Sequence, residues 1–160
     1  MDIIQDRDGF IWVATFGGAS RFDGIHFRNY TSSKGLAVNK VNAVFQDSKG
    51  QIWFGTLGGG LCYLDNNRFR YISEKDGLPN NNVNAITEDQ DGNMWFGTDG
   101  GISRFDGSSL ENFGSDSGGQ LTHVTDILIT RSGAVYASTT VSGCYKFNGK
   151  SFVRIKDAFS

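Results

Sequence analysis

The sequence predicts an all-β protein, namely a β-propeller with four blades of four antiparallel strands each, present as a partial or self-associating ring. Its 160 residues include 22 Gly, one Pro and 13% aromatic side chains, a composition that suits short strands joined by tight turns. Trp12, Trp53 and Trp95 recur at intervals of 41 and 42 residues, and Tyr136 follows 41 residues later. Four short apolar runs fall within each interval, as in one propeller blade.

The second copy of the repeat displays the four expected strands most clearly. They are VNAVFQD (41–47), QIWFGT (51–56), LCYLD (61–65) and RFRYI (68–72). A helical repeat would need continuous stretches with a period of 3.6 residues, and Gly-Gly or Asp-x-x-Gly interrupts each candidate. A leucine-rich solenoid would have shorter repeats with more Leu. We therefore expect one propeller domain, with blades at about 1–34, 35–76, 77–117 and 118–160.

An Asp-x-x-Gly turn precedes the aromatic residue in three copies, at Asp6, Asp47 and Asp89, and TRSG replaces it from Thr130. Such an Asp can accept backbone N–H groups of the turn, while the Gly adopts a positive φ. Calcium binding is the alternative, because DRDG and DQDG offer two carboxylates. However, DSKG carries Lys49, TRSG has no acid, and no Glu completes a calcium loop. We interpret the turns as structural and predict no metal and no cofactor.

The repeated aromatic position is interpreted as core between neighbouring blades, because the same strand position is aromatic in all four copies. A stacking platform for sugars is the alternative. The small pair after each aromatic residue, such as Gly55-Thr56, lets the end of the strand approach its neighbours closely.

The two cysteines occupy different positions of the repeat. Cys144 aligns with Ala19, Leu61 and Ile102, so we expect it to be a small core residue. Cys62 aligns elsewhere, and nothing in the spacing forces a disulfide between the two.

The stretch GLPNNNVNAITEDQDGNMWFGTDGGISRFDG (77–107) closely resembles the two-component regulator propeller repeat. The resemblance covers essentially the whole chain and is strongest in the second and third copies. The first copy lacks the GL lead-in, and the fourth departs through TRSG, Tyr136 and GGQLTH (118–123). The resemblance implies the extracytoplasmic or periplasmic sensor region of a bacterial hybrid histidine kinase, with seven-bladed rings in tandem that sense carbohydrate breakdown products.

Charge and hydropathy exclude several function classes. The formal net charge is −2 without a run of like charges, whereas a nucleic-acid footprint needs a clustered basic face. No stretch reaches the roughly 18 apolar residues of a membrane span, and no signal peptide is visible in this segment. No catalytic triad, metal cluster or phosphate loop stands out. The repeat position of His26 is polar in every copy, so we expect His26 on the solvent-exposed face of an edge strand.

The candidate site lies where loops of different blades converge. In a propeller, the connections from one blade to the next share a face with the turns between second and third strands. The copies differ from one another at these loops. Amides, a cation and an imidazole near an aromatic ring suit an oligosaccharide or another small polar ligand. The ligand-binding candidates are Phe16, Asn39, Lys40, Asn81, Asn82, Asp99 and His123.

The leading hypothesis for these loops is a non-catalytic sensor module. One alternative is a propeller lyase or hydrolase, resembling the streptogramin-lyase type, with His123 as the base. A third possibility is a scaffold whose faces bind protein.

An arc of four blades would expose an apolar face at each end, because each blade buries its faces against its neighbours. Met1 aligns with Asn42, so the first copy begins inside its first strand. We expect the chain to be a piece of a longer propeller, or to be completed by another segment. Closure of the four blades alone, as in small propellers, is one solution, and two chains joined into an eight-bladed ring is the other; we predict self-association.

Overall fold

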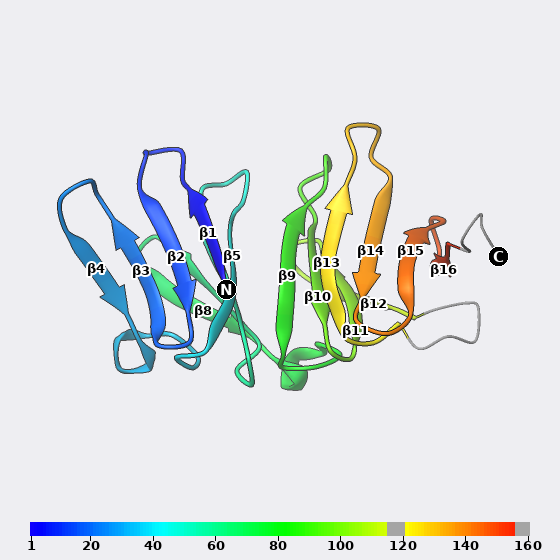
Figure 1. Cartoon of the computed structure of the whole chain (residues 1–160), viewed down its shortest axis with the longest axis horizontal. Helices are drawn as coiled ribbons and strands as arrows, with labels where there is room; N and C mark the ends of the chain where they lie inside the picture. The colour runs from blue at the N-terminus through cyan, green and yellow to red at the C-terminus, as the bar shows by residue number, and fades with distance from the viewer. Residues whose placement is uncertain (115–120, 156–160) are drawn as a thin grey trace.

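Four antiparallel sheets of four strands each follow one another along the chain (Figure 1). The computed structural model describes residues 1–114 and 121–155. Within them, the only helical elements are two short 3-10 turns, η1 (Ser32–Lys34) and η2 (Glu74–Asp76). The strands are β1 (Asp2–Gln5), β2 (Ile11–Thr15), β3 (Gly18–Phe22), β4 (Phe27–Tyr30), β5 (Val41–Gln46), β6 (Ile52–Thr56), β7 (Leu61–Asp65), β8 (Arg68–Ile72), β9 (Val83–Glu88), β10 (Met94–Thr98), β11 (Gly101–Phe105), β12 (Leu110–Phe113), β13 (Val124–Ile129), β14 (Val135–Thr139), β15 (Gly143–Phe147) and β16 (Phe152–Arg154).

The prediction of four-stranded antiparallel blades is confirmed, including the fourth copy, which departs most from the repeat pattern. In every sheet the strands lie in chain order, and the first strands β1, β5, β9 and β13 pack side by side along the inside of the arc. Each sheet lies within its expected range, while the expected boundary at 117/118 and the end at 160 lie outside the described residues. The ring is not closed in this segment, and the first and fourth sheets lie at opposite ends (Figure 1).

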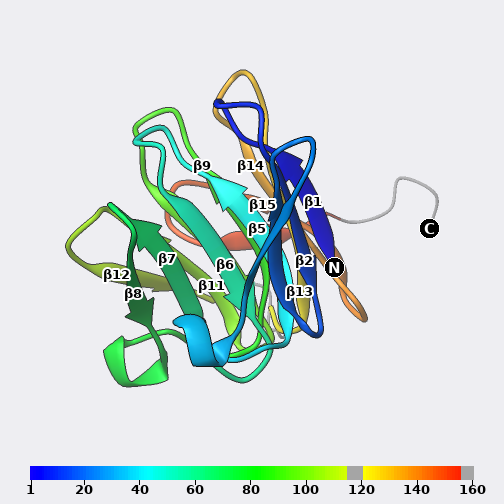
Figure 2. The same cartoon turned by 90° about the vertical axis from the view of Figure 1, so that its left-hand side faces the viewer.

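The arc has two distinct faces, which both views display (Figure 2). The turn face carries the turns between first and second strands, at 6–10, 47–51, 89–93 and 130–134. The connecting face carries η1, η2 and the turns between second and third strands, at 16–17, 57–60, 99–100 and 140–142. No helix in residues 1–114 and 121–155 combines the length and apolar character needed to cross a membrane.

The Asp-x-x-Gly turns fix both the chain reversal and the indole behind it. Asp47 Oδ1 accepts the backbone N–H groups of Lys49 at 3.0 Å and Gln51 at 2.8 Å, as expected. Asp47 Oδ2 also accepts the indole Nε1–H of Trp53 at 2.8 Å, a bond that sequence analysis did not foresee. The same indole bond recurs at 2.8 Å in the first and third copies. One carboxylate therefore satisfies two turn amides and one buried ring donor.

The three tryptophans are core residues between neighbouring sheets, as predicted, with exposed fractions of 2% each. Each indole packs against a Phe of the following sheet: Trp12 on Phe54, Trp53 on Phe96 and Trp95 on Phe147, with ring centroids 5.6, 5.5 and 5.3 Å apart. Because the buried clusters lie between sheets rather than within them, each blade depends on its neighbours for stability.

The glycines after two of the tryptophans allow the close approach that we predicted. A Cβ at Gly55 would lie 2.9 Å from the carbonyl oxygen of Val83, and one at Gly97 would lie 2.7 Å from Cγ1 of Val124. The Thr that follows each Gly closes the next turn instead, since Thr56 Oγ1 donates to the Gly60 carbonyl at 2.7 Å.

The last sheet corrects two expectations about core residues. Cys144 is exposed rather than buried, and Tyr136 is only partly buried. Both side chains lie on the side of the fourth sheet that faces away from the third, where none of the sheets in residues 1–114 and 121–155 covers them. Cys62, by contrast, is buried between the first two sheets, and burial raises the pKa of its thiol to about 11. The two thiols therefore differ in environment, and both are free.

Candidate ligand-binding site

Backbone hydrogen bonds bring the two sets of loops on the connecting face together. In each of the last three blades, the residue before the first strand accepts a bond from the start of the turn between second and third strands. Leu57 N–H donates to the Lys40 carbonyl at 2.9 Å, and Asp99 N–H donates to the Asn82 carbonyl at 3.1 Å. Thr140 N–H donates to the His123 carbonyl at 3.1 Å. The candidate residues Lys40, Asn82 and His123 thus occupy equivalent positions, and Asp99 lies in the turn that is hydrogen-bonded to Asn82.

Asp99 is the centre of a polar network that joins the third blade to the fourth. Its Oδ2 accepts a hydrogen bond from Asn82 Nδ2 at 2.8 Å, and its Oδ1 accepts one from Asn84 Nδ2 at 2.9 Å. The Asp99 carbonyl accepts the backbone N–H of His123 at 3.0 Å. Asn84 Nδ2 also donates to the Val124 carbonyl at 2.9 Å. Both carboxylate oxygens are therefore oriented before any ligand arrives.

Two of the predicted site residues are built into the connections between blades. Asn39 Oδ1 accepts the backbone N–H of Ser32 at 2.7 Å. Asn81 Oδ1 accepts the backbone N–H of Glu74 at 2.9 Å, and its own N–H donates to Glu74 Oε1 at 2.8 Å. These side-chain oxygens fix the first residue of each 3-10 turn, so a ligand would meet the amide nitrogens rather than the oxygens.

Lys40 and His123 present their charged or titratable groups to solvent. Among residues 1–114 and 121–155, no hydrogen bond or ion pair engages either the Lys40 ammonium or the His123 imidazole. His123 has φ +52°, a left-handed conformation that is uncommon for a residue with a side chain. Backbone bonds on both sides of the residue hold it there, and such outliers concentrate at functional sites.

Phe16 lies apart from the Asn82–Asp99–His123 group. It occupies the turn between β2 and β3 of the first blade, two blades away, and 55% of its surface is exposed. An exposed ring on the connecting face can contact a ligand only if that ligand extends along the arc.

A polar hollow of about 320 Å³ lies beside the Asp99 network, at the starts of the inner strands. A chain of hydrogen bonds runs along it: the Met1 ammonium donates to Asn42 Oδ1 at 2.9 Å, and Asn42 Nδ2 donates to Asn84 Oδ1 at 3.2 Å. Because Asn84 also bonds to Asp99, the hollow and the connecting face form one continuous polar surface. The hollow is lined by Met1, Asp2, Asn42, Ala43, Asn84, Ala85, Ile86, Thr125 and Asp126.

Sequence analysis missed the residues of this hollow, which we call the axial hollow. A signal was available, because Asn42, Asn84 and Thr125 hold one position of the repeat and are polar in three successive copies. Polar side chains recurring within an otherwise apolar strand indicate a surface that stays wet. Asp2 and Asp126 add one carboxylate each, in the sheets at the two ends of the arc.

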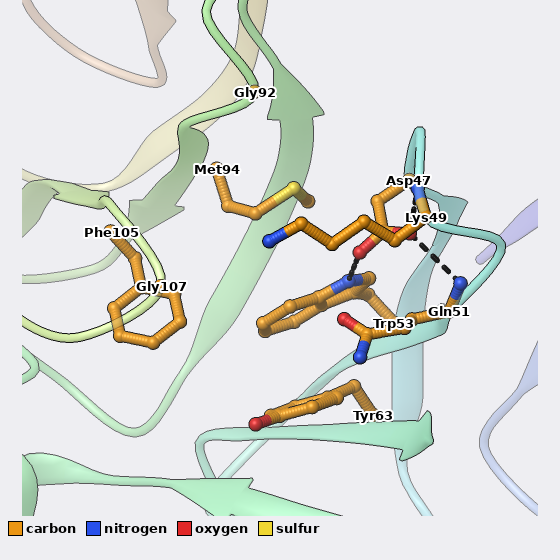
Figure 3. A pocket seen from close by; sticks show the side chains of 9 residues that line it. All are labelled: Asp47, Lys49, Gln51, Trp53, Tyr63, Gly92, Met94, Phe105 and Gly107. Atoms are coloured by element: carbon orange, nitrogen blue, oxygen red, sulfur yellow. Dashed lines mark hydrogen bonds between the residues drawn. The ribbon is translucent and has the colours of Figure 1, made fainter. Parts of the chain in front are cut away.

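A second, smaller cleft lies on the turn face between the second and third blades (Figure 3). Trp53 and Tyr63 stack at 4.1 Å between ring centroids, and the Lys49 side chain extends over the indole toward Met94. Its volume is about 100 Å³, below the roughly 300 Å³ at which small-molecule pockets begin. The remaining lining residues are Asp47, Gln51, Gly92, Phe105 and Gly107.

Metal-type side chains do not gather at either place. Across the described ranges 1–114 and 121–155, no three His, Cys, Asp or Glu side chains lie close enough to hold an ion together. The carboxylates of the Asp-x-x-Gly turns instead bind the amides and indoles described above.

Comparison with known proteins supports the fold and the repeat type. A family model described as the two component regulator propeller matches residues 1–17, 35–58 and 77–100. Three segments of the chain therefore match the two-component regulator propeller repeat. Each matched segment includes an Asp-x-x-Gly turn and its Trp, and the fourth blade is not matched. A comparison with curated protein sequences finds no match.

Solved structures resemble the whole arc of these propeller repeats. One is the extracellular domain of BT3049 from B. thetaiotaomicron, described as a putative hybrid two component system, with a TM-score of 0.83 and 27% identity over 94% of this chain and 22% of that one. The extracellular domain of BT4673 from the same organism has a TM-score of 0.76 and 21% identity, over 91% of this chain and 23% of that one. Virginiamycin B lyase from Staphylococcus aureus has a TM-score of 0.77 and 16% identity, over 98% of this chain and 55% of that one. At this identity the resemblance shows a shared fold alone. The chain thus spans less than a quarter of the length of these two-component relatives.

Proposed function

We propose that this propeller is a non-catalytic sensor module of a two-component regulatory system, that it lies outside the cytoplasm, and that it binds an oligosaccharide or another small polar ligand. The observation that carries the proposal is the continuous polar surface formed by the axial hollow and the Asp99 network. The extracellular two-component domains that share the fold support the setting.

The chemistry of this surface suits hydroxyl groups, which both donate and accept hydrogen bonds. Asp2 and Asp126 offer carboxylate acceptors in the axial hollow, and the side-chain oxygens of Asn42 and Asn84 are further acceptors there. Lys40 and His123 add donors at the rim. Because Asn82 and Asn84 already orient Asp99, a ligand would meet a preformed surface, which favours affinity.

The test is isothermal titration of the chain with a panel of defined neutral and acidic oligosaccharides. We expect Lys40→Ala and His123→Ala each to weaken binding of the best ligand by about tenfold, because each removes a free donor near the network. Lys49→Ala, a lysine on the turn face, is the matched control and should leave the affinity unchanged. If no oligosaccharide binds, or if only Lys49→Ala weakens binding, the proposed site is wrong.

The lyase alternative rests on His123 alone. A general base needs an orienting partner for its imidazole, and none contacts that ring within the described residues. Mass spectrometry of bound oligosaccharides and of a lactone panel after long incubation decides between the readings. Ligands that stay unchanged support a sensor. Cleavage products that the wild type forms and His123→Ala does not form would establish an enzyme. Binding of a specific protein in a pull-down, without any small-molecule binding, would instead favour a scaffold.

A further inference from the structure

Two arginines lie directly opposite each other on the first sheet and face the second sheet. Arg21 of β3 pairs with Arg28 of the outer strand β4, and on its other side Arg21 pairs with Trp12 of β2. Residues paired in this way share one face of an antiparallel sheet, and Trp12 packs on Phe54 of the second sheet. The two guanidinium groups therefore lie along the junction between the first and second blades, and both of those sheets are described.

Aromatic rings hold each guanidinium group in place. The guanidinium carbon of Arg21 lies 4.3 Å from the ring centroid of Phe10 and 5.9 Å from that of Trp12. The guanidinium carbon of Arg28 lies 5.3 Å from the ring centroid of Tyr30. Such contacts attract a cation to the face of a ring, but they do not neutralise its charge. Because Arg21 is half-buried and Arg28 is exposed, an anion from solvent can reach the pair.

The third sheet has an ion pair at the same two positions of the repeat. Arg104 occupies the position of Arg21, and its guanidinium carbon lies 5.5 Å from the ring centroid of Trp95. Glu111 occupies the position of Arg28, and its Oε2 accepts a hydrogen bond from Arg104 Nη2 at 2.6 Å. A carboxylate thus completes this arrangement in the third blade, where the first blade has a second guanidinium group.

The surroundings of the two positions are otherwise closely alike. In both sheets the indole stacks on an aromatic ring of the outer strand, with centroids 5.4 Å apart. In both sheets a Ser of the third strand also donates a hydrogen bond to an Asn of the outer strand. The exchange of Glu for Arg therefore reverses one charge within a shared framework. The equivalent pairs are Trp12–Tyr30 and Trp95–Phe113, and Ser20–Asn29 and Ser103–Asn112.

No carboxylate in residues 1–114 and 121–155 forms an ion pair with Arg21 or Arg28. The acid closest to them in sequence, Asp23, is engaged elsewhere: its Oδ1 accepts the backbone N–H groups of Ile25 at 2.9 Å and His26 at 2.7 Å. Like charges directly opposite each other on a sheet repel and destabilise it. An anion bound between the two guanidinium groups would remove that repulsion.

We propose that the Arg21–Arg28 pair binds the carboxylate group of a small acid, in the place that the Glu111 carboxylate holds beside Arg104. The planar guanidinium fork matches a carboxylate with two parallel hydrogen bonds, and such charge-assisted bonds are strong. The aromatic contacts orient both groups in advance, which lowers the cost of binding. This site lies on the third and outer strands, whereas the axial hollow lies on the inner strands, so the two sites are separate.

The experiment is isothermal titration of the intact chain with glutarate at low ionic strength, because glutarate ends in the same group as a Glu side chain. Arg28→Gln should weaken glutarate binding by about tenfold, since it removes charge-assisted hydrogen bonds. The matched control is Arg70→Gln, at the same repeat position of the second sheet, where Tyr63 rather than Arg lies opposite. This control should leave the affinity unchanged, and circular dichroism verifies that both variants stay folded.

Arg28→Glu tests the comparison with the third blade by a second measurement. This variant supplies the carboxylate from the chain itself, so it should abolish glutarate binding and raise the urea midpoint of unfolding. Glutaramide, the uncharged diamide of the same acid, should not bind the wild type. Glutarate binding that survives in Arg28→Glu, or glutaramide binding as tight as that of glutarate, would overturn the proposal.

NMR signals of the arginine Nε–H groups locate the bound glutarate. The signals of Arg21 and Arg28 should shift during the titration, while those of Arg70 and of Arg104, which Glu111 already holds, stay in place. Lys40→Ala, on the connecting face, should leave these shifts unchanged, so the result does not depend on the ligand site proposed above. No binding of glutarate, or equal shifts at all four arginines, would contradict the assignment.

Discussion

The turn face and the connecting face of this propeller are built from the same four-fold repeat, but they use it differently. On the turn face, Asp and Trp recur six residues apart, and each carboxylate is engaged by its own turn and its own indole. On the connecting face, one repeated position carries Lys40, Asn82 and His123 in successive blades. Two of these three side chains are exposed, and the third orients Asp99.

This difference indicates how a repeat protein separates stability from recognition. The Asp that satisfies a buried donor and the Trp that fills the space between blades are the same in the first three copies. Positions whose backbone is held by flanking hydrogen bonds can vary in side chain without loss of the fold. Variation on a rigid scaffold is the usual basis of binding sites on loops. The predictions below test this division, beginning with the largest expected effect.

Trp53→Ala should destabilise the chain by about 3–5 kcal/mol, because it removes a fully buried ring and leaves a cavity between the second and third sheets. The matched variant is Tyr136→Ala, at the same repeat position in the fourth sheet, where only part of the ring is covered. Urea unfolding followed by circular dichroism gives both free energies. Equal losses in the two variants would show that packing between sheets is not what stabilises the tryptophan position.

Asp47→Ala should lower the free energy of unfolding by about 1–3 kcal/mol, because the buried indole N–H of Trp53 and two turn amides lose their acceptor. Lys40→Ala, at an exposed position of the connecting face, should change it by less than about 0.5 kcal/mol. The same urea experiment compares them. A loss for Lys40→Ala as large as that for Asp47→Ala would contradict the division between the faces.

Lowering the pH should reduce the free energy of unfolding through protonation of Asp89 on the turn face. Burial acts to raise the pKa of this carboxyl, but hydrogen bonds from the Trp95 indole, from Asn93 and from the Asp91 amide outweigh it, so the pKa is lowered. A lowered pKa contributes stability above the unfolded value of about 3.9, and that contribution is lost as pH falls through the folded value. Because the carboxyl of Asp89 is only partly buried, solvent screening keeps the effect below about 1 kcal/mol.

Asp89→Asn should therefore make the decline of stability below about pH 4 shallower. Asp91→Asn is the control, since its side chain accepts none of these bonds. Urea midpoints measured from neutral pH downward give the two slopes. An unchanged slope in Asp89→Asn would show that the indole bond contributes no pH dependence.

Much of the fold followed from the sequence because its signals are local and repeated. The spacing of Trp12, Trp53 and Trp95 established the blades, and Asp-x-x-Gly established the turns. The Asp–indole bond was missed because it depends on how the turn folds back onto its strand. The axial hollow was missed because Asn42 and Asn84 meet only when the inner strands curve into an arc.

Aligning the repeats also led to one wrong prediction. The alignment assumes that equivalent residues in different copies are covered by equivalent neighbouring sheets. Cys144 aligns with Leu61 and Ile102, which a following sheet buries. No sheet formed by the described residues packs on that side of the fourth sheet, and the equivalent side chain is exposed. Equivalence in sequence predicts the position of a residue in its blade but not what covers it.

Mapping a bound oligosaccharide by amide NMR shifts of the labelled chain tests the central claim most directly, namely that recognition belongs to the connecting face. Binding there should shift the amides of Lys40, Asn84, Asp99 and His123, while those of the turns at 47–51 and 89–93 stay in place. Shifts concentrated instead at Lys49, Trp53 and Tyr63, around the small cleft of the turn face, would contradict it.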